Sequence, residues 1–167
     1  QSPRGEISFQ YTTGDEIPFK RWARGERPKV EEYKKRGRRR WRVRWRKSRH
    51  RGEGYIQFKR YLKNIFTYAG TASLSRELKK RNPREVQVGD LYLQGGFPGH
   101  AILVLDLAKH PKYGLIALLG QSYMPAQDPH VLKNLNQPEL SPWFVIPTSR
   151  DLDTPEWTFQ ATDLYHF

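Results

Sequence analysis

The chain holds 167 residues, of which 37% are hydrophobic and 13% aromatic, and it contains no cysteine. A chain of this length can bury a sizeable core as one domain. Without cysteine it has no disulfide framework and no thiolate metal site, and no run of 18 apolar residues predicts a membrane-spanning helix. The net charge of +13 is local, because residues 34–51 hold 12 Lys or Arg and no acid, whereas the remainder holds 18 basic and 17 acidic residues.

The first half of the chain predicts strands followed by a helix. Residues 6–12 and 40–46 alternate apolar and polar side chains, which is typical of half-buried strands, and residues 29–33 offer one candidate partner for the second. Residues 55–80 change to helical spacing, with a wide apolar stripe. Gly70 interrupts this stripe, which indicates either close backbone packing or a short break.

The second half predicts a sheet. Strands are expected at 90–94, 101–107, 115–119 and 143–146, and the second is almost continuously apolar, as in a strand buried on both faces. Together with the helix at 55–80, these strands predict an α+β fold. We expect a central antiparallel sheet or partial barrel packed against one long helix.

Two polar side chains stand at neighbouring strand ends in this sheet. His100 heads the strand at 101–107, and Gln121 ends the next strand. An imidazole at a strand head can act as a general base near neutral pH, and Gln121 can orient it by accepting its second N–H. The alternative is structural, with His100 capping the strand and Gln121 satisfying buried backbone groups.

Residues around this pair are candidate ligand contacts. The glycine-rich loop before His100 lets a substrate backbone approach closely, and residues 124–127 predict a loop over the strand ends. The candidate binding residues are Gly96, Gly99, Ser122, Tyr123 and Gln127. The five histidines lack the spacing of a zinc motif, so we expect no metal and no cofactor.

The order of these elements resembles the papain-like peptidoglycan hydrolases of the NlpC and CHAP types. A helix is followed by the Gly89-Asp90 lead-in, the strand headed by His100 and the strand that ends at Gln121. The resemblance implies a papain-like fold in which His100 is the catalytic base and Gln121 orients it. The nucleophile of those enzymes is a cysteine at the start of a preceding helix, and this sequence has none.

A closer resemblance is to a bacterial family of domains of unknown function. It rests on YLKNIFTYAGTASLSREL, GGFPGHAILVLDLA, LLGQSYMPAQDPHVLKN and TPEW, which lie within residues 55–157. The resemblance implies longer members with a further N-terminal helix that begins in a Cys-Ala-Asp-like sequence. We therefore expect a single domain over residues 1–167 that lacks this helix. No established activity comes with the resemblance.

Residues 34–51 form a basic strand or hairpin insertion in this domain. A row of arginines can follow phosphates, and exposed tryptophans can stack on bases. Because Trp41, Val43 and Trp45 share one face, we expect them in the core, with the arginines in solvent. The outward arginines Arg40, Arg42, Arg44 and Arg46 then favour any polyanion: nucleic acid, teichoic or lipid phosphate, or acidic glycan.

These observations leave three functional readings. We expect a papain-like domain that binds a peptidoglycan fragment or another polyanion without catalysis, in an extracytoplasmic or periplasmic setting. The first alternative is a cysteine-type hydrolase or transferase, of the amidase or peptidase kind, with His100 as base and the nucleophile supplied from outside the chain. The second alternative is a basic nucleic-acid-binding module that works through residues 34–51. The sequence does not indicate an oligomeric state.

Overall fold

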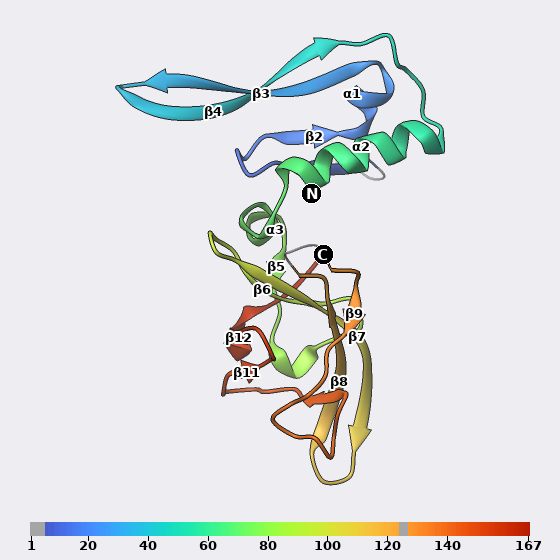
Figure 1. Ribbon diagram of the computed structural model, residues 1–167, viewed down its shortest axis with the longest axis vertical. Helices are drawn as coiled ribbons and strands as arrows, with labels where there is room; N and C mark the ends of the chain where they lie inside the picture. Colours follow the sequence, from blue (N-terminus) through green and yellow to red (C-terminus); the bar gives the residue numbers. More distant parts are fainter. Residues whose placement is uncertain (1–5, 124–126) are drawn as a thin grey trace. The chain divides into compact units, whose positions relative to one another are not determined.

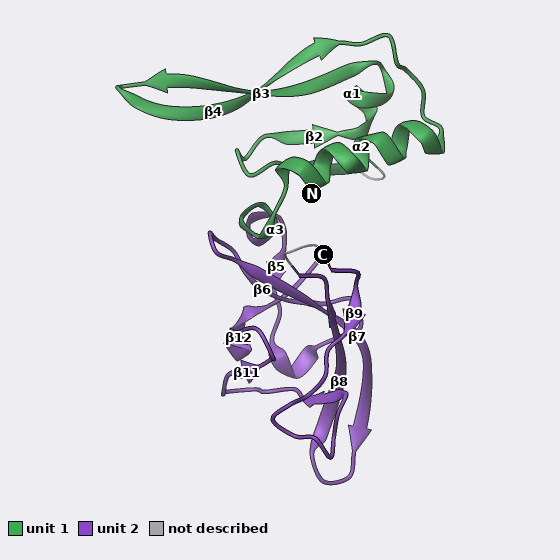
Figure 2. Ribbon diagram, in the orientation of Figure 1, with its two compact units in different colours: residues 1–74 green, residues 75–167 purple. Residues whose placement is uncertain are grey.

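The computed structural model describes residues 6–123 and 127–167 and shows a mostly β protein, with about 40% of its residues in strands and 20% in helices. The chain divides into two compact units, unit 1 over residues 1–74 and unit 2 over residues 75–167 (Figure 2). Each unit has its own cluster of buried apolar side chains. Most of the loop predicted at 124–127 lies outside the described residues, which resume at Gln127.

Unit 1 consists of two antiparallel strand pairs and helices (Figure 1). In chain order its elements are β1 (Ser8–Gln10), β2 (Glu16–Pro18), α1 (Phe19–Ala23), β3 (Glu26–Lys35), β4 (Arg38–Lys47) and α2 (Tyr55–Tyr68), and α3 (Thr71–Glu77) spans the boundary to unit 2. The pairing of residues 29–33 with 40–46 is confirmed and extends along a two-stranded hairpin. Its turn uses Arg36 at φ 50° and Gly37 at φ 75°, the positive values that suit a two-residue hairpin turn.

Helix α2 packs its apolar face into the core of unit 1. Tyr61 and Ile65 of α2 are buried together with Tyr11, Ile17 and Trp22. The Tyr61 hydroxyl donates a hydrogen bond to the Ile17 carbonyl oxygen at 2.5 Å, which fixes the helix against β2. The cluster is largely aromatic, so a few large side chains supply most of its buried area.

The helical region is interrupted at Gly70. Helix α2 ends at Tyr68, and α3 begins at Thr71. No atom outside its immediate neighbours lies within 4 Å of a side-chain carbon built on Gly70, so the break, and not close packing, explains this glycine. The Ser73 hydroxyl lies 3.0 Å from the Gly70 amide nitrogen and 2.9 Å from its carbonyl oxygen, which ties α3 to the break.

Unit 2 is built on an antiparallel sheet of seven strands, in the order β10-β8-β7-β6-β13-β5, with β9 also paired to β8. The strands of unit 2 as a whole are β5 (Lys79–Lys80), β6 (Leu91–Gln94), β7 (His100–His110), β8 (Gly114–Gln121), β9 (His130–Val131), β10 (Trp143–Val145), β11 (Leu152–Asp153), β12 (Thr158–Phe159) and β13 (Leu164–His166). Short 3-10 turns lie at Pro83–Glu85 and Ala161–Asp163. The strands predicted at 90–94, 101–107, 115–119 and 143–146 are therefore confirmed. Figure 1 shows β7 and β8 as the long pair of this unit.

The predicted packing of one long helix on the sheet is wrong, and with it the α+β, papain-like architecture. The helical region is two short helices, and α2 packs on aromatic residues of unit 1. Several small sheets, with no closed barrel among the described residues, replace the expected partial barrel. Periodicity identified the apolar face of the helix but could not identify its partner, because the contacts join residues far apart in sequence.

Two predictions of burial are also wrong. Trp41 is 55% exposed, and only Val43 and Trp45 of that face are half-buried against the unit 1 core. In β7, Leu103 and Leu105 are 38% and 39% exposed. The strand is therefore covered on one face only. In the described part of the chain, no helix is long and apolar enough to cross a membrane.

Candidate functional site

The antiparallel pairing of β7 and β8 brings His100 and Gln121 together. His100 is the first residue of β7 and Gln121 is the last of β8, so both stand at the same end of the sheet. The Nε2 atom of His100 lies 2.7 Å from Oε1 of Gln121, and both side chains are buried. The predicted pair is therefore a direct contact in the structure.

Glu156 fixes the orientation of this contact. The Nε2 atom of Gln121 donates a hydrogen bond to Oε2 of Glu156 at 2.9 Å. The Gln121 oxygen consequently faces His100 and acts as the acceptor, which assigns the imidazole hydrogen to Nε2. In the neutral imidazole, Nδ1 then carries the lone pair, and no other described side chain forms a hydrogen bond with this ring. No pattern in the sequence predicted Glu156 as part of this site.

Aromatic rings hold the imidazole in place. Tyr123 meets it edge-on at 5.3 Å between ring centroids, and Trp157 and Phe159 lie at 5.5 and 5.9 Å. The indole Nε1 of Trp157 donates to Oε1 of Gln94 at 2.8 Å, which anchors this wall to β6. The C-terminal segment therefore provides both the carboxylate behind Gln121 and the aromatic wall beside His100.

A cavity of about 390 Å³ opens next to His100. Its lining residues are Pro98, Gly99, His100, Ser122, Tyr123, Gln127 and Trp157. Four of the five candidate binding residues predicted near His100 thus line one cavity. Gly96 does not line it, whereas Trp157, which was not among the predicted site residues, does.

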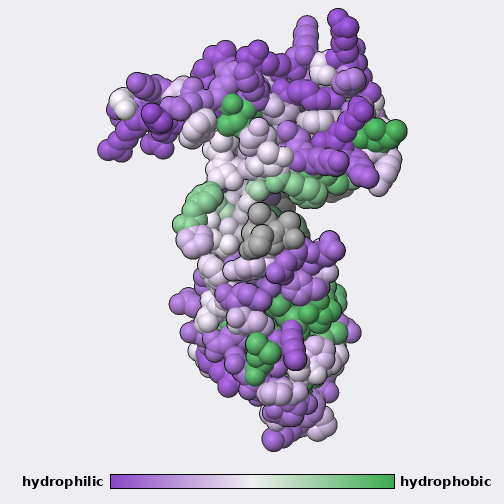
Figure 3. Space-filling view, in the orientation of Figure 1, coloured by the Kyte–Doolittle hydropathy of each residue, from purple (hydrophilic) through white to green (hydrophobic). Residues whose placement is uncertain are grey.

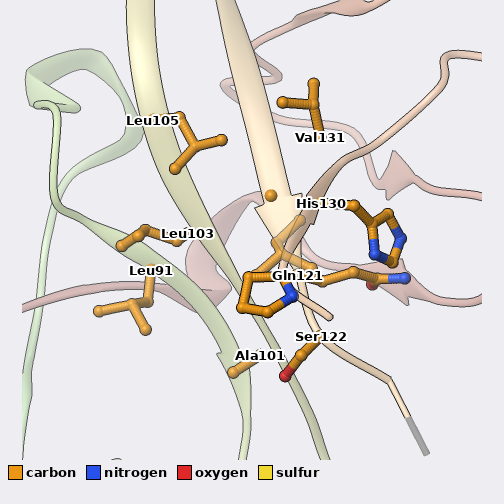
Figure 4. Close-up of a pocket in the computed structure, with 11 residues that line it drawn as sticks. Leu91, Ala101, Leu103, Leu105, Gln121, Ser122, His130 and Val131 are labelled. Carbon is orange, nitrogen blue, oxygen red and sulfur yellow. The ribbon is translucent and has the colours of Figure 1, made fainter. Parts of the chain in front are cut away.

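A second cavity, an apolar trough of about 420 Å³, lies on the sheet (Figure 4). Leu91, Leu103, Leu105 and Val131 project toward it, and Ser122 lines both this trough and the His100 cavity. The two exposed leucines of β7 are therefore part of a defined hollow beside the candidate site.

The comparisons with known proteins identify a family for the chain. The sequence pattern of the family named Domain of unknown function (4846) matches residues 1–166. The chain belongs to this family. The family spans both units, whereas no curated protein and no solved structure matches the chain. The resemblance to the NlpC and CHAP hydrolases thus has no support from these comparisons.

The Gly89-Asp90 lead-in of this family member has a structural role. Asp90 is buried, and its Oδ2 accepts a hydrogen bond from the Gln87 amide at 2.8 Å. The same oxygen lies 2.8 Å from Nε of Arg81 as an ion pair. These contacts fix the chain just before β6 and support the strand beside β7.

Side chains that could replace the missing cysteine, or hold a metal ion, are not gathered at His100. The Ser73 hydroxyl is committed to Gly70, and Ser122 lines the cavity without a hydrogen bond to the imidazole. Among residues 6–123 and 127–167, no three His, Asp or Glu side chains lie together in a group suited to a metal ion. The described site thus contains an imidazole in contact with an amide, but no described hydroxyl is hydrogen-bonded to that imidazole.

The four predicted arginines belong to unit 1 and not to this site. Arg40, Arg42, Arg44 and Arg46 are all exposed on β4, and Figure 3 shows a mostly hydrophilic hairpin surface. Arg46 and Arg44 lie 2.9 and 3.3 Å from the Glu31 carboxylate. The hydrogen bond from Arg46 is the main reason that the pKa of Glu31 is lowered.

Proposed function

We propose that this chain forms the base-bearing part of a hydrolase or transferase site, with the nucleophile supplied from outside the chain. The observation that carries the proposal is the 2.7 Å contact between His100 Nε2 and Gln121 Oε1. It leaves Nδ1 as the imidazole atom that can accept a proton. A buried structural histidine would also be hydrogen-bonded, so the proposal rests on this contact together with the cavity that opens beside the ring.

The chemistry follows from this tautomer. A thiol or hydroxyl that attacks an acyl carbon loses its proton to Nδ1 of His100, and the resulting imidazolium returns that proton to the leaving group. Gln121 Oε1 keeps its hydrogen bond to Nε2 in both protonation states. The aromatic rings around the imidazole limit its rotation, so Nδ1 stays in one position. A general base placed in this way contributes about 10²–10⁴-fold to a rate.

The apolar trough supports an external source of the nucleophile. It offers Leu103, Leu105 and Val131 to solvent, and it shares Ser122 with the cavity of His100. An apolar polypeptide segment seated there lies on the open face of the sheet, and its end reaches the His100 cavity by passing Ser122, which directly follows β8. We propose that such a segment carries the cysteine or serine that this chain does not place at His100.

A second candidate function is binding without turnover. It is favoured by the exposed arginines of β4, which suit a peptidoglycan fragment with attached anionic polymer or another cell-envelope polyanion. The two functions differ in the role of His100. A binder should keep its affinity for peptidoglycan fragments in His100→Ala and form no product, whereas a hydrolase should form a product that His100→Ala abolishes.

A small thiol can substitute for the external nucleophile in a direct test. We expect the chain to accelerate cleavage of p-nitrophenyl acetate by added β-mercaptoethanol, because Nδ1 of His100 can take the thiol proton. His100→Ala should lower this thiol-dependent rate at least about tenfold, less than the full effect of a general base because a diffusing thiol is not positioned.

The matched control is His50→Ala, which removes an exposed imidazole outside the site and should leave the rate unchanged. Equal rates for the wild type, His100→Ala and His50→Ala would contradict the proposal. A rate lost equally in both variants would reduce the effect to nonspecific imidazole catalysis, which also contradicts it.

A further inference from the structure

The distal part of the β3–β4 hairpin contains a polar cavity that the proposed function does not use. The cavity measures about 660 Å³. Its lining residues are Thr13, Tyr33, Lys35, Arg36, Arg38, Arg40 and Trp41, all of unit 1. Four of these seven side chains are cations, and none of the described lining residues is acidic. A cavity of this composition attracts an anion.

The cations of the hairpin fall into two groups. Near its base, Glu31 lies 4.0 Å from Lys29 and within 3.3 Å of Arg44 and Arg46, so these charges are partly compensated. The cations that line the cavity are Lys35, Arg36, Arg38 and Arg40, and they form no ion pair with any described residue, whereas the neighbouring Arg39 lies 3.4 Å from Glu32. The uncompensated charge is thus concentrated around the cavity.

Two aromatic rings line the same cavity. Trp41 is 55% exposed, although its alternation with Val43 and Trp45 predicted burial. Tyr33 is held from one side by Arg42, whose guanidinium carbon lies 4.9 Å from the ring centroid. Trp41 lines the cavity from the face of β4 opposite to Arg38 and Arg40, and its exposed indole provides a flat surface on which another ring can stack.

The turn itself adds a cation at some conformational cost. Arg36 has φ 50°, a left-handed value at which glycine or asparagine is preferred. The adjacent Gly37 accommodates its own φ of 75° without strain. The two-residue turn itself requires these positive φ values, so Arg36 contributes its charge to the cavity and its backbone conformation follows from the hairpin.

We propose that the distal β3–β4 hairpin is a binding site for single-stranded nucleic acid. Bases stack on Trp41, and the phosphates lie against the four distal cations. Alternate residues of a strand stand about 7 Å apart, so Arg42 continues this row of charge along β4. The site prefers single strands to duplex, because only unpaired bases can leave their own stack for the indole.

The proposal predicts a specific salt dependence. Four phosphates neutralised on a single strand give a slope of about −3 in a plot of log affinity against log salt. We would measure it with the whole chain by fluorescence anisotropy, using a labelled oligothymidylate and an abasic oligomer of the same length. Oligothymidylate should bind more tightly than the abasic oligomer, which carries the phosphates without bases.

Two pairs of variants separate stacking from charge. Trp41→Ala should weaken oligothymidylate binding about 5- to 100-fold, and Trp41→Phe, which keeps a ring, should restore most of it. Arg38→Gln with Arg40→Gln should weaken binding and flatten the slope by about 1.4. The matched control is Arg44→Gln with Arg46→Gln. It also removes two positive charges, but from arginines that are paired with Glu31, so it should change the slope less.

Several results would overturn the proposal. Equal effects of the two arginine pairs, equal binding of the abasic oligomer, or no effect of Trp41→Ala would reduce the hairpin to a general polyanion surface. Tighter, Trp41-dependent binding to phosphatidylglycerol vesicles or heparin would make a lipid or an acidic glycan the ligand. His100→Ala should leave oligonucleotide binding unchanged, so this test is independent of the hydrolase proposal.

Discussion

The two longest strand pairs of the molecule, β3–β4 and β7–β8, both expose apolar side chains, but in different settings. Trp41 on β4 stands among uncompensated cations on an isolated two-stranded hairpin. Leu103 and Leu105 on β7 stand in an apolar trough at the centre of a seven-stranded sheet. The exposure of an apolar side chain therefore indicates a different kind of surface in each of the two strand pairs.

These settings determine which kind of ligand each surface can bind. The hairpin has a core only at its base, where Val43 and Trp45 pack against unit 1, so its distal side chains are free to meet a charged, flat ligand. The β7–β8 pair has one face that is buried at His100, Ile102 and Val104, and one open face that suits an apolar segment. The following substitutions test this contrast, in order of decreasing effect.

Tyr61→Ala should give the largest effect. Tyr61 is fully buried, packs against Trp22 and Phe19, and donates to the Ile17 carbonyl. Its removal should lower the free energy of unfolding by about 3–5 kcal/mol, as for other large-to-small core changes. Because the hairpin depends on this core, hydrogen exchange should accelerate in β4 while β7 and β8 stay protected.

Phe66→Ala on the same helix is the matched control. Phe66 is 74% exposed, so its loss should change the free energy of unfolding by no more than about 0.5 kcal/mol. Chemical denaturation of both variants measures the difference. Faster exchange in β7 and β8 of Tyr61→Ala would show that the two strand pairs unfold together, and the contrast between them would then fail.

Local signals of the sequence predicted the longer elements of the fold, but not α1 or the short strands β2, β5, β9 and β11 to β13. The apolar stripe gave α2, Gly70 marked the break before α3, and the turn residues bounded β6, β7 and β8. His100 and Gln121 were predicted as partners because neighbouring antiparallel strands must bring one strand's first residue close to the next strand's last. These inferences need only short-range geometry.

Long-range packing could not be predicted in the same way. No local pattern predicts that α2 packs on Tyr11 and Trp22 instead of on the sheet. No local pattern predicts that one face of β7 stays open either. Glu156 was missed for the same reason, since it contacts Gln121 across 35 positions of the chain. A signal was present in TPEW, where a carboxylate precedes a tryptophan, but nothing local links it to the strand ends.

Gly120→Ala should have a smaller effect and act on the trough. A β-carbon at Gly120 would lie 2.7 Å from Leu105 Cδ1 and 3.2 Å from the His130 carbonyl oxygen. Leu105 can rotate away but the backbone of β9 cannot, so we expect a loss of about 1–3 kcal/mol of unfolding free energy. The trough should also narrow, and an apolar dye that binds there should bind less tightly.

Gly70→Ala provides the comparison for this substitution. Gly70 has no positive φ and has open space around it, so alanine should be neutral or stabilise the protein by about 0.4–1 kcal/mol. Thermal denaturation of both variants distinguishes the sites. Equal stability of Gly120→Ala and the wild type would show that β9 yields easily, and that the trough is less fixed than the His100 cavity.

The smallest expected effect is a loss of hairpin stability at low pH, through the carboxylate of Glu31. The hydrogen bond from Arg46 and the nearby charges of Arg44 and Lys29 lower the pKa of Glu31 below its usual value of about 4.3. A carboxylate with a lowered pKa in the folded state contributes stability above its unfolded pKa, and this contribution is lost as the pH falls through the folded value. Acid should therefore weaken the hairpin slightly below about pH 4.3.

Glu31→Gln removes this acid-dependent contribution. Its stability should vary less with pH than that of the wild type in the acidic range, and the difference should shrink in about 1 M salt, where exposed charges are screened. Exchange rates of β4 amides measured against pH report the effect locally. Identical pH profiles for wild type and variant would mean that Glu31 does not compensate the charges of Arg44 and Arg46. The distinction between these arginines and the uncompensated cations at the distal end of the hairpin would then fail.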